Sequence, residues 1–329
     1  MKITVLGDGG WGTTLAILLN NNKYSVTIWS VFEDYAQYLD KHRQNPKFLP
    51  GIKIPKKIKI TSDLKVAVNG AGLIVLAVPS QYMRSVLKKL EPAGVPGSVP
   101  FLSVSKGVED KTLLRMSEVI EDVLGKRHIA VLSGPTISYE VARQLPTTVV
   151  AASKNPALAK KIQGIFNTPD FRIYTSSDVI GVELGGSLKN VIAIAAGALD
   201  GFGLEANTKA GLITRGLAEI SRLGVAMGAK RETFFGVSGL GDLVTTCISE
   251  HGRNRWFGEE IGKGKKPKDI LKKTDMVVEG IVTARSAYQL SKKYRVEMPI
   301  IKEVYAVLYQ NKSPRQAVED LMTREKKEE

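Results

Sequence analysis

Short apolar runs alternate with amphipathic stretches over roughly the first half of the chain. Residues 73–78 are continuously apolar, which is typical of a strand buried on both faces of a sheet, and strands are also expected at residues 3–6 and 129–132. Further strands are expected at residues 26–29, 58–60, 99–104, 147–152 and 171–174, and helices at residues 13–20, 33–39, 80–90, 112–124 and 156–166. The alternation predicts an α/β domain with a mainly parallel, doubly wound sheet. Residues 45–57 are expected to form a loop, because proline and glycine interrupt them repeatedly.

The pattern changes after Asp178. Apolar residues recur at helical spacing over residues 179–199, 212–227, 281–290 and 300–308, with no convincing strand between them. We therefore expect an α/β domain over residues 1–179 and an all-helical domain over residues 180–329.

Composition favours an ordinary globular protein. The 329 residues are 43% hydrophobic and include a single cysteine, Cys247, so that neither an intramolecular disulfide nor a cysteine zinc site is expected. The three histidines show no metal-ligand spacing, and no metal is predicted. Residues 1–6 run into Asp8 without a cleavage site, and no apolar run is expected to reach the roughly 20 residues of a membrane helix. A cytoplasmic protein without membrane insertion is expected.

A formal charge of +14 indicates an anionic partner. Forty-seven Lys and Arg face 33 Asp and Glu, which suits nucleic acid, an anionic membrane or a phosphorylated small molecule. The basic clusters at residues 53–59 and 263–273 are interpreted as solvated surface. The second cluster contains no aromatic residue on which a base could stack. We therefore expect no nucleic acid, and a small phosphorylated substrate stays among the partners that the charge leaves open.

Closely spaced glycines separate the first strand from the first helix. The spacing Gly7-x-Gly9-x-x-Gly12 allows a sharp turn at Gly7, close approach of a pyrophosphate at Gly9 and tight packing of the helix at Gly12. Phosphates would then meet the unpaired N–H groups at the positive end of that helix. The strand before and the strand after favour a dinucleotide site over a purely structural turn.

Four further segments place polar residues where apolar or structural ones are expected. Lys106 follows an apolar strand, and residues 133–136 (SGPT) are expected to open a helix with its N–H groups directed at an anion. The other two segments are residues 185–193 (GGSLKNVIA) and 239–255 (GLGDLVTTCISEHGRNR).

Lys189 is the candidate general base. The helix around it is almost entirely small and apolar, so its charge would be buried unless it faced a cavity. Partial desolvation beside a second cation would lower its pKa, which suits proton abstraction. Arg253 is a candidate phosphate clamp, with a surface ion pair as the alternative. Asp242 could serve a glycine-bounded turn instead of chemistry.

At these segments the sequence resembles the bacterial-type, NAD(P)-dependent glycerol-3-phosphate dehydrogenase family. The matching strings are GDGGWGTTLA, SVSKGVE, LSGPTISYEVA, GGSLKNVIAIAAG, GLGDLVTTC and GRNRWFG, in family order. The resemblance implies a Rossmann domain, a helical domain like that of 6-phosphogluconate dehydrogenase, and a homodimer. It also implies interconversion of sn-glycerol 3-phosphate and dihydroxyacetone phosphate with NAD or NADP, which supplies phospholipid synthesis.

The resemblance also implies roles for individual residues. Lys189 would be the proton acceptor. Substrate contacts would come from Lys106, Gly134, Thr136, Lys189, Asp242, Gly252, Arg253 and Asn254. Cofactor contacts would come from Gly7, Gly9, Gly10, Trp11, Gly12, Val31, Lys106, Ser138, Arg253, Val277 and Glu279.

Two departures from the family pattern affect these expectations. Gly10 and Gly252 stand where many members have serine, so only backbone contacts could remain there. After the second strand, Ser30 and Val31 provide neither the acid that binds a ribose 2′-hydroxyl nor the base that binds a 2′-phosphate. Glu33 or Asp34 could repel a 2′-phosphate, but the preference between NAD and NADP stays open.

Three other functions were weighed. A β-hydroxyacid dehydrogenase of the 6-phosphogluconate type would share the lysine-bearing helix, but not SVSKGVE and SGPT followed by GRNR. A nucleic-acid-binding protein with a vestigial dinucleotide domain would bind polynucleotides in a salt-sensitive way. A dinucleotide sensor would bind cofactor without turnover.

Overall fold

The computed structural model describes residues 1–274, 277–326 and 328, and it divides the chain into two units. Unit 1 contains Met1–Lys106 and Leu114–Glu183, and unit 2 contains Gly107–Leu113 and Leu184–Glu329. Each unit is described separately below.

Unit 1 is built on an eight-stranded sheet with the order β10-β9-β8-β7-β6-β1-β2-β5. The strands are β1 (Lys2–Leu6), β2 (Ser25–Trp29), β5 (Lys59–Thr61), β6 (Ala71–Leu76), β7 (Phe101–Ser103), β8 (Ile129–Ser133), β9 (Thr147–Ala152) and β10 (Phe171–Ser176). All neighbours are parallel except β8 and β9. The predicted doubly wound, mainly parallel sheet is confirmed. Its order reverses between β1 and β6, the kind of position where such sheets bind ligands.

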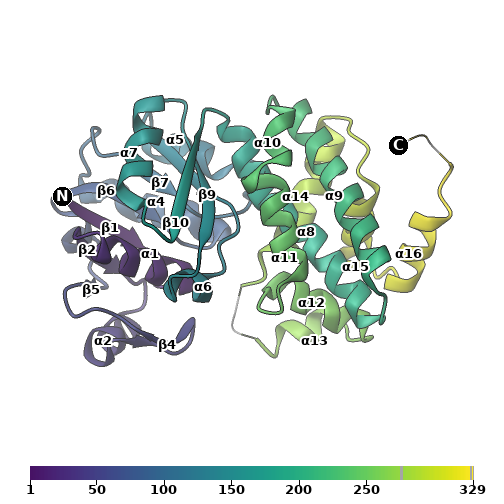
Figure 1. The fold of residues 1–329 in the computed structure, drawn as a ribbon, viewed down its shortest axis with the longest axis horizontal. Coiled ribbons are helices and arrows are strands. Elements are labelled where there is room, and N and C mark those ends of the chain that lie inside the picture. The colour runs from purple at the N-terminus through teal and green to yellow at the C-terminus, as the bar shows by residue number, and fades with distance from the viewer. Residues whose placement is uncertain (275–276, 327, 329) are drawn as a thin grey trace. The chain divides into compact units, whose positions relative to one another are not determined.

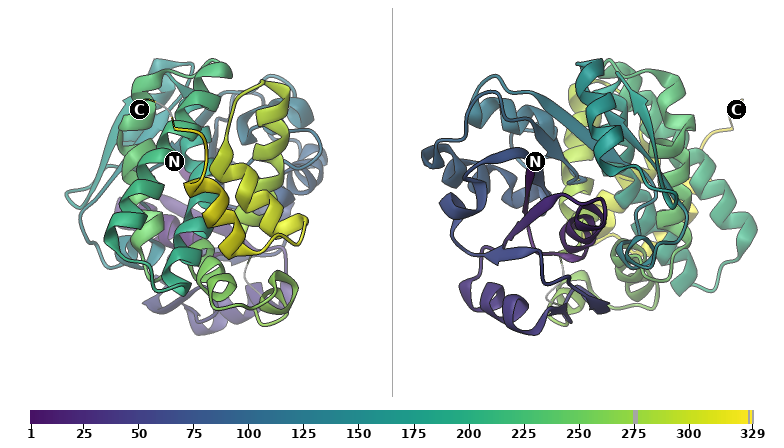
Figure 2. Two further views of the ribbon diagram at one scale, coloured as in Figure 1. Left: turned by 90° about the vertical axis from the view of Figure 1, so that its right-hand side faces the viewer. Right: turned by 60° about the vertical axis from the view of Figure 1, so that its left-hand side comes forward.

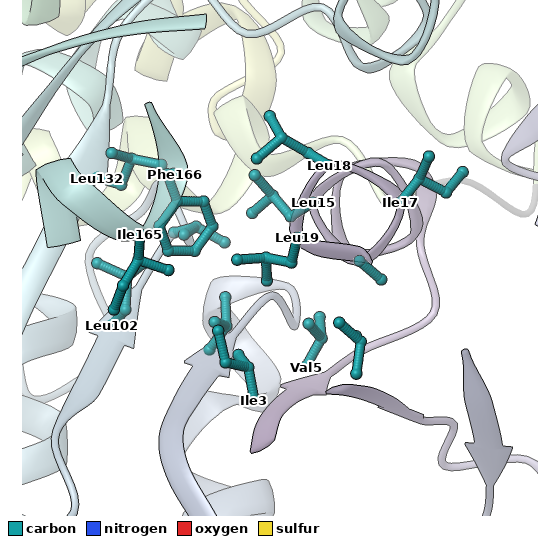
Figure 3. Close-up of a cluster of buried hydrophobic side chains, with 14 of the residues drawn as sticks. Ile3, Val5, Leu15, Ile17, Leu18, Leu19, Leu102, Leu132, Ile165 and Phe166 are labelled. Atoms are coloured by element: carbon teal, nitrogen blue, oxygen red, sulfur yellow. The ribbon is translucent and has the colours of Figure 1, made fainter. Parts of the chain in front are cut away.

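Helices cover both faces of this sheet (Figure 1). They are α1 (Gly10–Asn21), α2 (Glu33–His42), α3 (Leu64–Val68), α4 (Met83–Leu90), α5 (Met116–Leu124), α6 (Ser138–Ala142) and α7 (Pro156–Phe166), with single turns η1 (Ser80–Tyr82) and η2 (Glu91–Ala93). One core cluster joins α1 and α7 to the sheet, and another joins α3, α4 and α5 to its other face. Figure 3 shows Leu15 and Leu19 of α1 turned toward Phe166 of α7. Burial of these large apolar side chains holds α1 against β1.

The loop expected at residues 45–57 is in part an antiparallel hairpin. Strands β3 (Gln44–Asn45) and β4 (Leu49–Lys53) pair with each other apart from the main sheet. Pro50 and Gly51 are tolerated because this short strand has an exposed edge. Leu49 and Ile54 are buried in the core of unit 1, which anchors the hairpin.

The helix expected at residues 112–124 begins later, at Met116. Lys111 and Leu113 have φ of 70° and 61°, which no right-handed helix allows. The segment before this helix belongs to unit 2, where the Asp110 carboxylate accepts hydrogen bonds from Arg285 Nε at 3.1 Å and Nη2 at 2.6 Å. This contact between residues far apart in the sequence replaces the helical start.

The elements that the structure describes in unit 2 are all helices, as the left view of Figure 2 shows. Its helices are α8 (Val179–Gly201), α9 (Ala206–Ala226), α10 (Arg231–Phe235), the π-helix η3 (Val237–Gly241), α11 (Asp242–Ile248), α12 (Arg253–Gly262), α13 (Pro267–Leu271), α14 (Glu279–Lys293), α15 (Pro299–Tyr309) and α16 (Pro314–Met322). The first five residues of α8 belong to unit 1. The predicted change from α/β to all-helical structure is confirmed.

Helix α8 passes through the core of unit 2 and touches α12 through glycines. A Cβ at Gly197 would lie 1.8 Å from the Arg255 carbonyl oxygen, and a Cβ at Gly258 would lie 1.9 Å from the Ile194 carbonyl oxygen. Only residues without a side chain permit this backbone approach. The crossing explains why α8 is so rich in small residues.

The expectation that no apolar run reaches membrane length is wrong for α8. This helix has 23 residues and a mean hydropathy of 1.5 in its most apolar 18-residue window. However, 89% of that window is buried inside the protein, and the charged residues Glu183 and Lys189 interrupt the apolar sequence of the helix. Burial of this kind is typical of the core helix of a globular protein.

Candidate functional site

The glycine turn of unit 1 leaves open space at one position and none at the other two. A Cβ at Gly7 would lie 2.6 Å from the Ala77 carbonyl oxygen, and a Cβ at Gly12 would lie 2.1 Å from the Gly7 carbonyl oxygen. Gly7 also has φ of 120°, which favours glycine. At Gly9, by contrast, a Cβ would meet nothing within 4 Å. The turn is thus tightly packed on the protein side and open at Gly9, and the N–H groups at the start of α1 lie beside that opening. These features fit the pyrophosphate of a dinucleotide.

A buried amide fixes the position of this turn. Asn45, which is fully buried, donates from Nδ2 to the Asp8 carbonyl oxygen at 2.7 Å and to Thr13 Oγ1 at 2.8 Å. Its Oδ1 accepts from Tyr35 Oη at 2.6 Å. Burial raises the pKa of Tyr35 to about 12, so this hydroxyl stays a hydrogen-bond donor at neutral pH. The hairpin and α2 therefore hold the glycine turn in place.

Other expected cofactor residues lie around the same turn. A Cβ at Gly10 would lie 2.6 Å from the Phe48 carbonyl oxygen and 3.5 Å from Ser138 Oγ, so serine in its place would require the hairpin to move. Trp11 packs its ring 6.4 Å from the Phe171 ring. Val31 is 46% exposed. The structure thus brings Gly10 and Ser138 together and leaves Val31 at the surface.

Lys106 is held at the carboxyl ends of the strands by the segment after β8. Its Nζ donates to the Gly134 carbonyl oxygen at 2.8 Å and to Thr136 Oγ1 at 2.9 Å. Gly134 has φ of 141°, and a Cβ there would lie 3.0 Å from Val149 Cα. The expected helix start at residues 133–136 is wrong, since α6 begins only at Ser138. The strained backbone at Gly134 delays the helix and turns its own carbonyl oxygen, not a row of N–H groups, toward Lys106.

In unit 2, Lys189 is buried and paired with a carboxylate. Its Nζ forms an ion pair with Asp242 and donates to Thr246 Oγ1 at 2.6 Å. Lys189 is 6% exposed, and Asp242 is fully buried. A second cation was expected beside Lys189 from the sequence, but the charged partner that the structure describes is the Asp242 carboxylate. Asp242 follows the π-helix η3, a rare element often found at functional sites.

Close packing explains why this carboxylate reaches Lys189. A Cβ at Gly185 would lie 2.6 Å from the Ser238 carbonyl oxygen, so α8 and η3 meet at the level of their backbones. Helix α11 starts where η3 ends, and Asp242 and Thr246 lie one helical turn apart on it. Thr246 was assigned no role from the sequence, although its spacing from Asp242 could have identified it.

Asn254 belongs to a second buried network. Its Nδ2 donates to Asn190 Oδ1 at 2.9 Å, and its Oδ1 accepts from the Gly280 N–H at 2.9 Å. These bonds link α8, α12 and α14, and Asn190 directly follows Lys189 in the sequence. Asn190 was also not assigned a role from the sequence, although it is the second polar residue that interrupts the apolar helix.

Arg253 lies at the start of α12 and contacts another expected cofactor residue. Its Nη1 donates to the Val277 carbonyl oxygen at 3.0 Å. Gly252 is the N-cap residue of α12, and Glu279 is the first residue of α14. The structure thus brings Arg253 and Val277 together.

Two chemistries receive no support from the described residues. Burial raises the pKa of Cys247 to about 12, which removes the thiolate needed for a nucleophile at neutral pH. Within residues 1–274, 277–326 and 328, no three His, Cys, Asp or Glu side chains are grouped as metal ligands.

Comparisons with known proteins point to a single family. The models of the N-terminus and the C-terminus of NAD-dependent glycerol-3-phosphate dehydrogenase match residues 2–159 and 178–319. A glycerol-3-phosphate dehydrogenase [NAD(P)+] from Fusobacterium nucleatum is 50% identical over 329 residues, covering 99% of this chain and 98% of the relative. One from Geobacter sulfurreducens is 49% identical, covering 100% and 98%. A crystal structure of glycerol-3-phosphate dehydrogenase from Coxiella burnetii superposes with a TM-score of 0.95 at 36% identity, covering 98% of this chain and 99% of that one.

Proposed function

Because the chain belongs to the NAD-dependent glycerol-3-phosphate dehydrogenase family, we propose that it interconverts sn-glycerol 3-phosphate and dihydroxyacetone phosphate. NAD or NADP, when bound, accepts the hydride from C2 of the alcohol or returns it to the ketone. The observation that carries the proposal is the buried Lys189 in the mostly apolar helix α8, paired with Asp242 of α11. Family membership favours this substrate over the β-hydroxyacid alternative.

Lys189 moves the proton that accompanies the hydride. As an amine it removes the proton from the C2 hydroxyl during oxidation, and as an ammonium it donates that proton to the ketone oxygen during reduction. Asp242 stabilises the ammonium form, and Thr246 restricts the orientation of Nζ. Without these two partners, a buried ammonium would be too costly to maintain.

The other site residues are proposed to bind the ligands. Lys106, with Gly134 and Thr136, presents a cation and a hydroxyl to the substrate from unit 1. In unit 2, Arg253 would clamp a phosphate through its guanidinium, with Gly252 and Asn254 beside it in the sequence. The glycine turn, Trp11, Val31 and Ser138 are proposed as cofactor contacts, together with Arg253, Val277 and Glu279.

We also propose a homodimer in the cytoplasm that supplies glycerol 3-phosphate for phospholipid synthesis. The single buried cysteine suits a reducing compartment. Light scattering at several protein concentrations tests the dimer, which should give twice the mass of one chain.

The first test is oxidation of NADH and NADPH, followed optically with and without dihydroxyacetone phosphate. Loss of absorbance that requires the ketone would support the proposed reaction. If a folded preparation consumed neither cofactor, the proposed reaction would be wrong, although the fold would stand.

Substitution of Lys189 tests the proton acceptor. Lys189→Ala should lower kcat by about 10³-fold, because general acid–base catalysis contributes an effect of this order. NADH affinity, measured by fluorescence, should stay nearly unchanged. Lys209→Ala is the matched control, because Lys209 also pairs with an aspartate of unit 2, Asp200, but is assigned no part in the reaction. Comparable losses of kcat in both variants would remove the special role of Lys189.

A further inference from the structure

The end of β2 lacks the residue that usually selects between NAD and NADP. In doubly wound dinucleotide folds, an acid at this position binds the ribose 2′-hydroxyl of NAD, or a nearby arginine binds the 2′-phosphate of NADP. Here Ser30 and Val31 follow β2, and neither is the acid or the arginine that makes this selection. By sequence alone, the preference stays undecided.

The structure places a carboxylate at that position from a different segment. Asp8, the second residue of the glycine turn, accepts a hydrogen bond through Oδ2 from Ser30 Oγ at 2.5 Å. The turn is tied to β2 by its backbone as well, because the Gly7 N–H donates to the Trp29 carbonyl oxygen at 3.0 Å. Ser30 is fully buried, whereas Asp8 is half-buried. The carboxylate therefore lies at the end of β2 and keeps access to solvent.

The backbone of Asp8 is held, so that its carboxylate has a defined position. The Asp8 carbonyl oxygen accepts from Asn45 Nδ2 at 2.7 Å and from Thr13 Oγ1 at 3.2 Å. The pKa of Asp8 is raised, because the effect of burial exceeds the opposing effects of the hydrogen bond from Ser30 and the charge of Lys47. A carboxylate fixed in this way is a preorganised acceptor for a hydroxyl group.

The surrounding charges also oppose a phosphate. Glu33 and Asp34 occupy the first turn of α2, which begins three residues after Ser30. They offset the positive end of the helix, where a phosphate would otherwise bind. Lys47 is the cation that acts on Asp8 from the hairpin side. Glu33 and Asp34 thus add two carboxylates to that of Asp8 in the segment that follows β2.

We propose that Asp8 accepts a hydrogen bond from the ribose 2′-hydroxyl of NAD and repels the 2′-phosphate of NADP, so that this chain prefers NAD. The inference rests on the proposed use of a dinucleotide. It assigns cofactor selection to a residue of the glycine turn instead of a residue at the end of the second strand.

Binding of the two cofactors without substrate tests this assignment. NADH and NADPH are titrated separately into the full-length protein, followed by nicotinamide fluorescence at fixed ionic strength. The wild-type protein should bind NADH at least about tenfold more tightly than NADPH, the ratio produced by roughly 1.4 kcal/mol. In Asp8→Asn, which keeps a polar group for Ser30 but removes the charge, NADPH should bind about tenfold more tightly and NADH somewhat less tightly.

A matched control separates the position of the charge from the charge itself. Asp34→Asn removes one acid from the first turn of α2 that has no bond to Ser30, and it should change the NADH to NADPH ratio by less than about threefold. If Asp34→Asn and Asp8→Asn shift the ratio equally, the selection comes from the general field and the assignment to Asp8 is wrong. Urea unfolding of each variant shows whether its fold is retained.

The outcomes separate this inference from the proposed reaction. Equal affinity of the wild-type protein for NADH and NADPH would overturn the role of Asp8, while turnover with dihydroxyacetone phosphate would leave the reaction standing. Preferential binding of NADH with no turnover would support Asp8 and contradict the reaction. Binding of neither cofactor would overturn both.

Discussion

At the residue scale, the main feature of this protein is an ion pair buried where the sequence suggests only an isolated lysine. Lys189 and Asp242 lie 53 positions apart in the chain, and both are almost completely buried. Such a pair costs desolvation energy, so its net contribution to folding is small. In the proposed reaction, its value lies in holding the proton-transferring group at one position in a dry environment.

Thr246 is predicted to tune this pair. Its hydroxyl accepts from Lys189 Nζ and donates to the Asp242 carbonyl oxygen at 2.7 Å. Thr246→Val keeps the shape but removes both bonds, and kcat should fall about tenfold, as expected for one hydrogen bond to a charged group. Steady-state kinetics, with KM for NADH unchanged, provide the measurement.

The neighbouring threonine supplies the control. Among the contacts that the structure describes, the Thr245 hydroxyl bonds only to the Gly241 carbonyl oxygen, at 3.0 Å. Thr245→Val should therefore leave kcat within about twofold of wild type. A similar loss of kcat in both variants would show that the helix, and not the bond to Lys189, is responsible.

At the element scale, glycines determine how closely the helices of unit 2 approach one another. Gly197 and Gly201 of α8 face Gly258 and Gly262 of α12, and each would meet backbone atoms if it carried a Cβ. The crossing places Asn190 and Asn254 within hydrogen-bond distance, at 2.9 Å. The small residues around Lys189 thus serve helix packing as well as the site.

Two glycine-to-alanine substitutions should have opposite effects on stability. Gly197→Ala puts a Cβ 1.8 Å from the Arg255 carbonyl oxygen and should lower the free energy of unfolding by about 3 kcal/mol, the upper part of the overpacking range. Gly211→Ala changes an exposed position of α9 with nothing within 4 Å, and it should raise that free energy by about 0.5–1 kcal/mol. Urea unfolding measures both. Equal effects would contradict the close packing of α8 on α12.

A buried glutamate makes the attachment of α15 sensitive to pH. Glu219 of α9 is 1% exposed and accepts from the N–H groups of Ile300 at 2.7 Å and Ile301 at 3.2 Å. Burial raises its pKa from 4.5 to about 7, against the opposing effects of these bonds and of Arg222 and Arg324. The folded protein therefore binds this proton more tightly than the unfolded chain does. Stability should fall as pH rises from about 4.5 to about 7.

Substitution of Glu219 by glutamine tests this sensitivity. The free energy of unfolding of the wild-type protein, relative to Glu219→Gln, should fall by up to about 3 kcal/mol between pH 5 and pH 8. Urea unfolding across this range provides the measurement, with the exposed Glu232→Gln as the matched control. A difference between wild type and Glu219→Gln that does not change with pH would contradict the raised pKa.

At the scale of the whole molecule, the charge of +14 creates a field that favours anionic ligands. The KM for dihydroxyacetone phosphate should therefore rise about threefold when the salt concentration increases from about 0.05 M to about 0.5 M, because salt screens this attraction. The value of kcat should change little, since Lys189 and Asp242 are buried away from solvent ions. Initial rates at several salt concentrations test this, and a KM that falls with salt would contradict it.

The sequence determined the class of each half of the chain and indicated the residues that are proposed to bear the chemistry. Continuous apolar runs identify buried parallel strands, and the spacing of Gly7, Gly9 and Gly12 identifies the turn after β1, because both depend on neighbours along the chain. For the same reason, an isolated lysine in a helix of small residues identifies Lys189.

Only the tertiary structure decided which charges meet. Three contacts join residues that are 22 to 175 positions apart in the chain. They are the pair of Lys189 with Asp242, the bond from Ser30 to Asp8, and the pair of Arg285 with Asp110. The hairpin at residues 44–53 and the late starts of α5 and α6 have the same origin, since buried contacts and positive φ angles overrode local propensity. Local spacing predicts elements, but long-range packing determines which polar groups can be buried together, because each of them needs a partner that the local sequence does not supply.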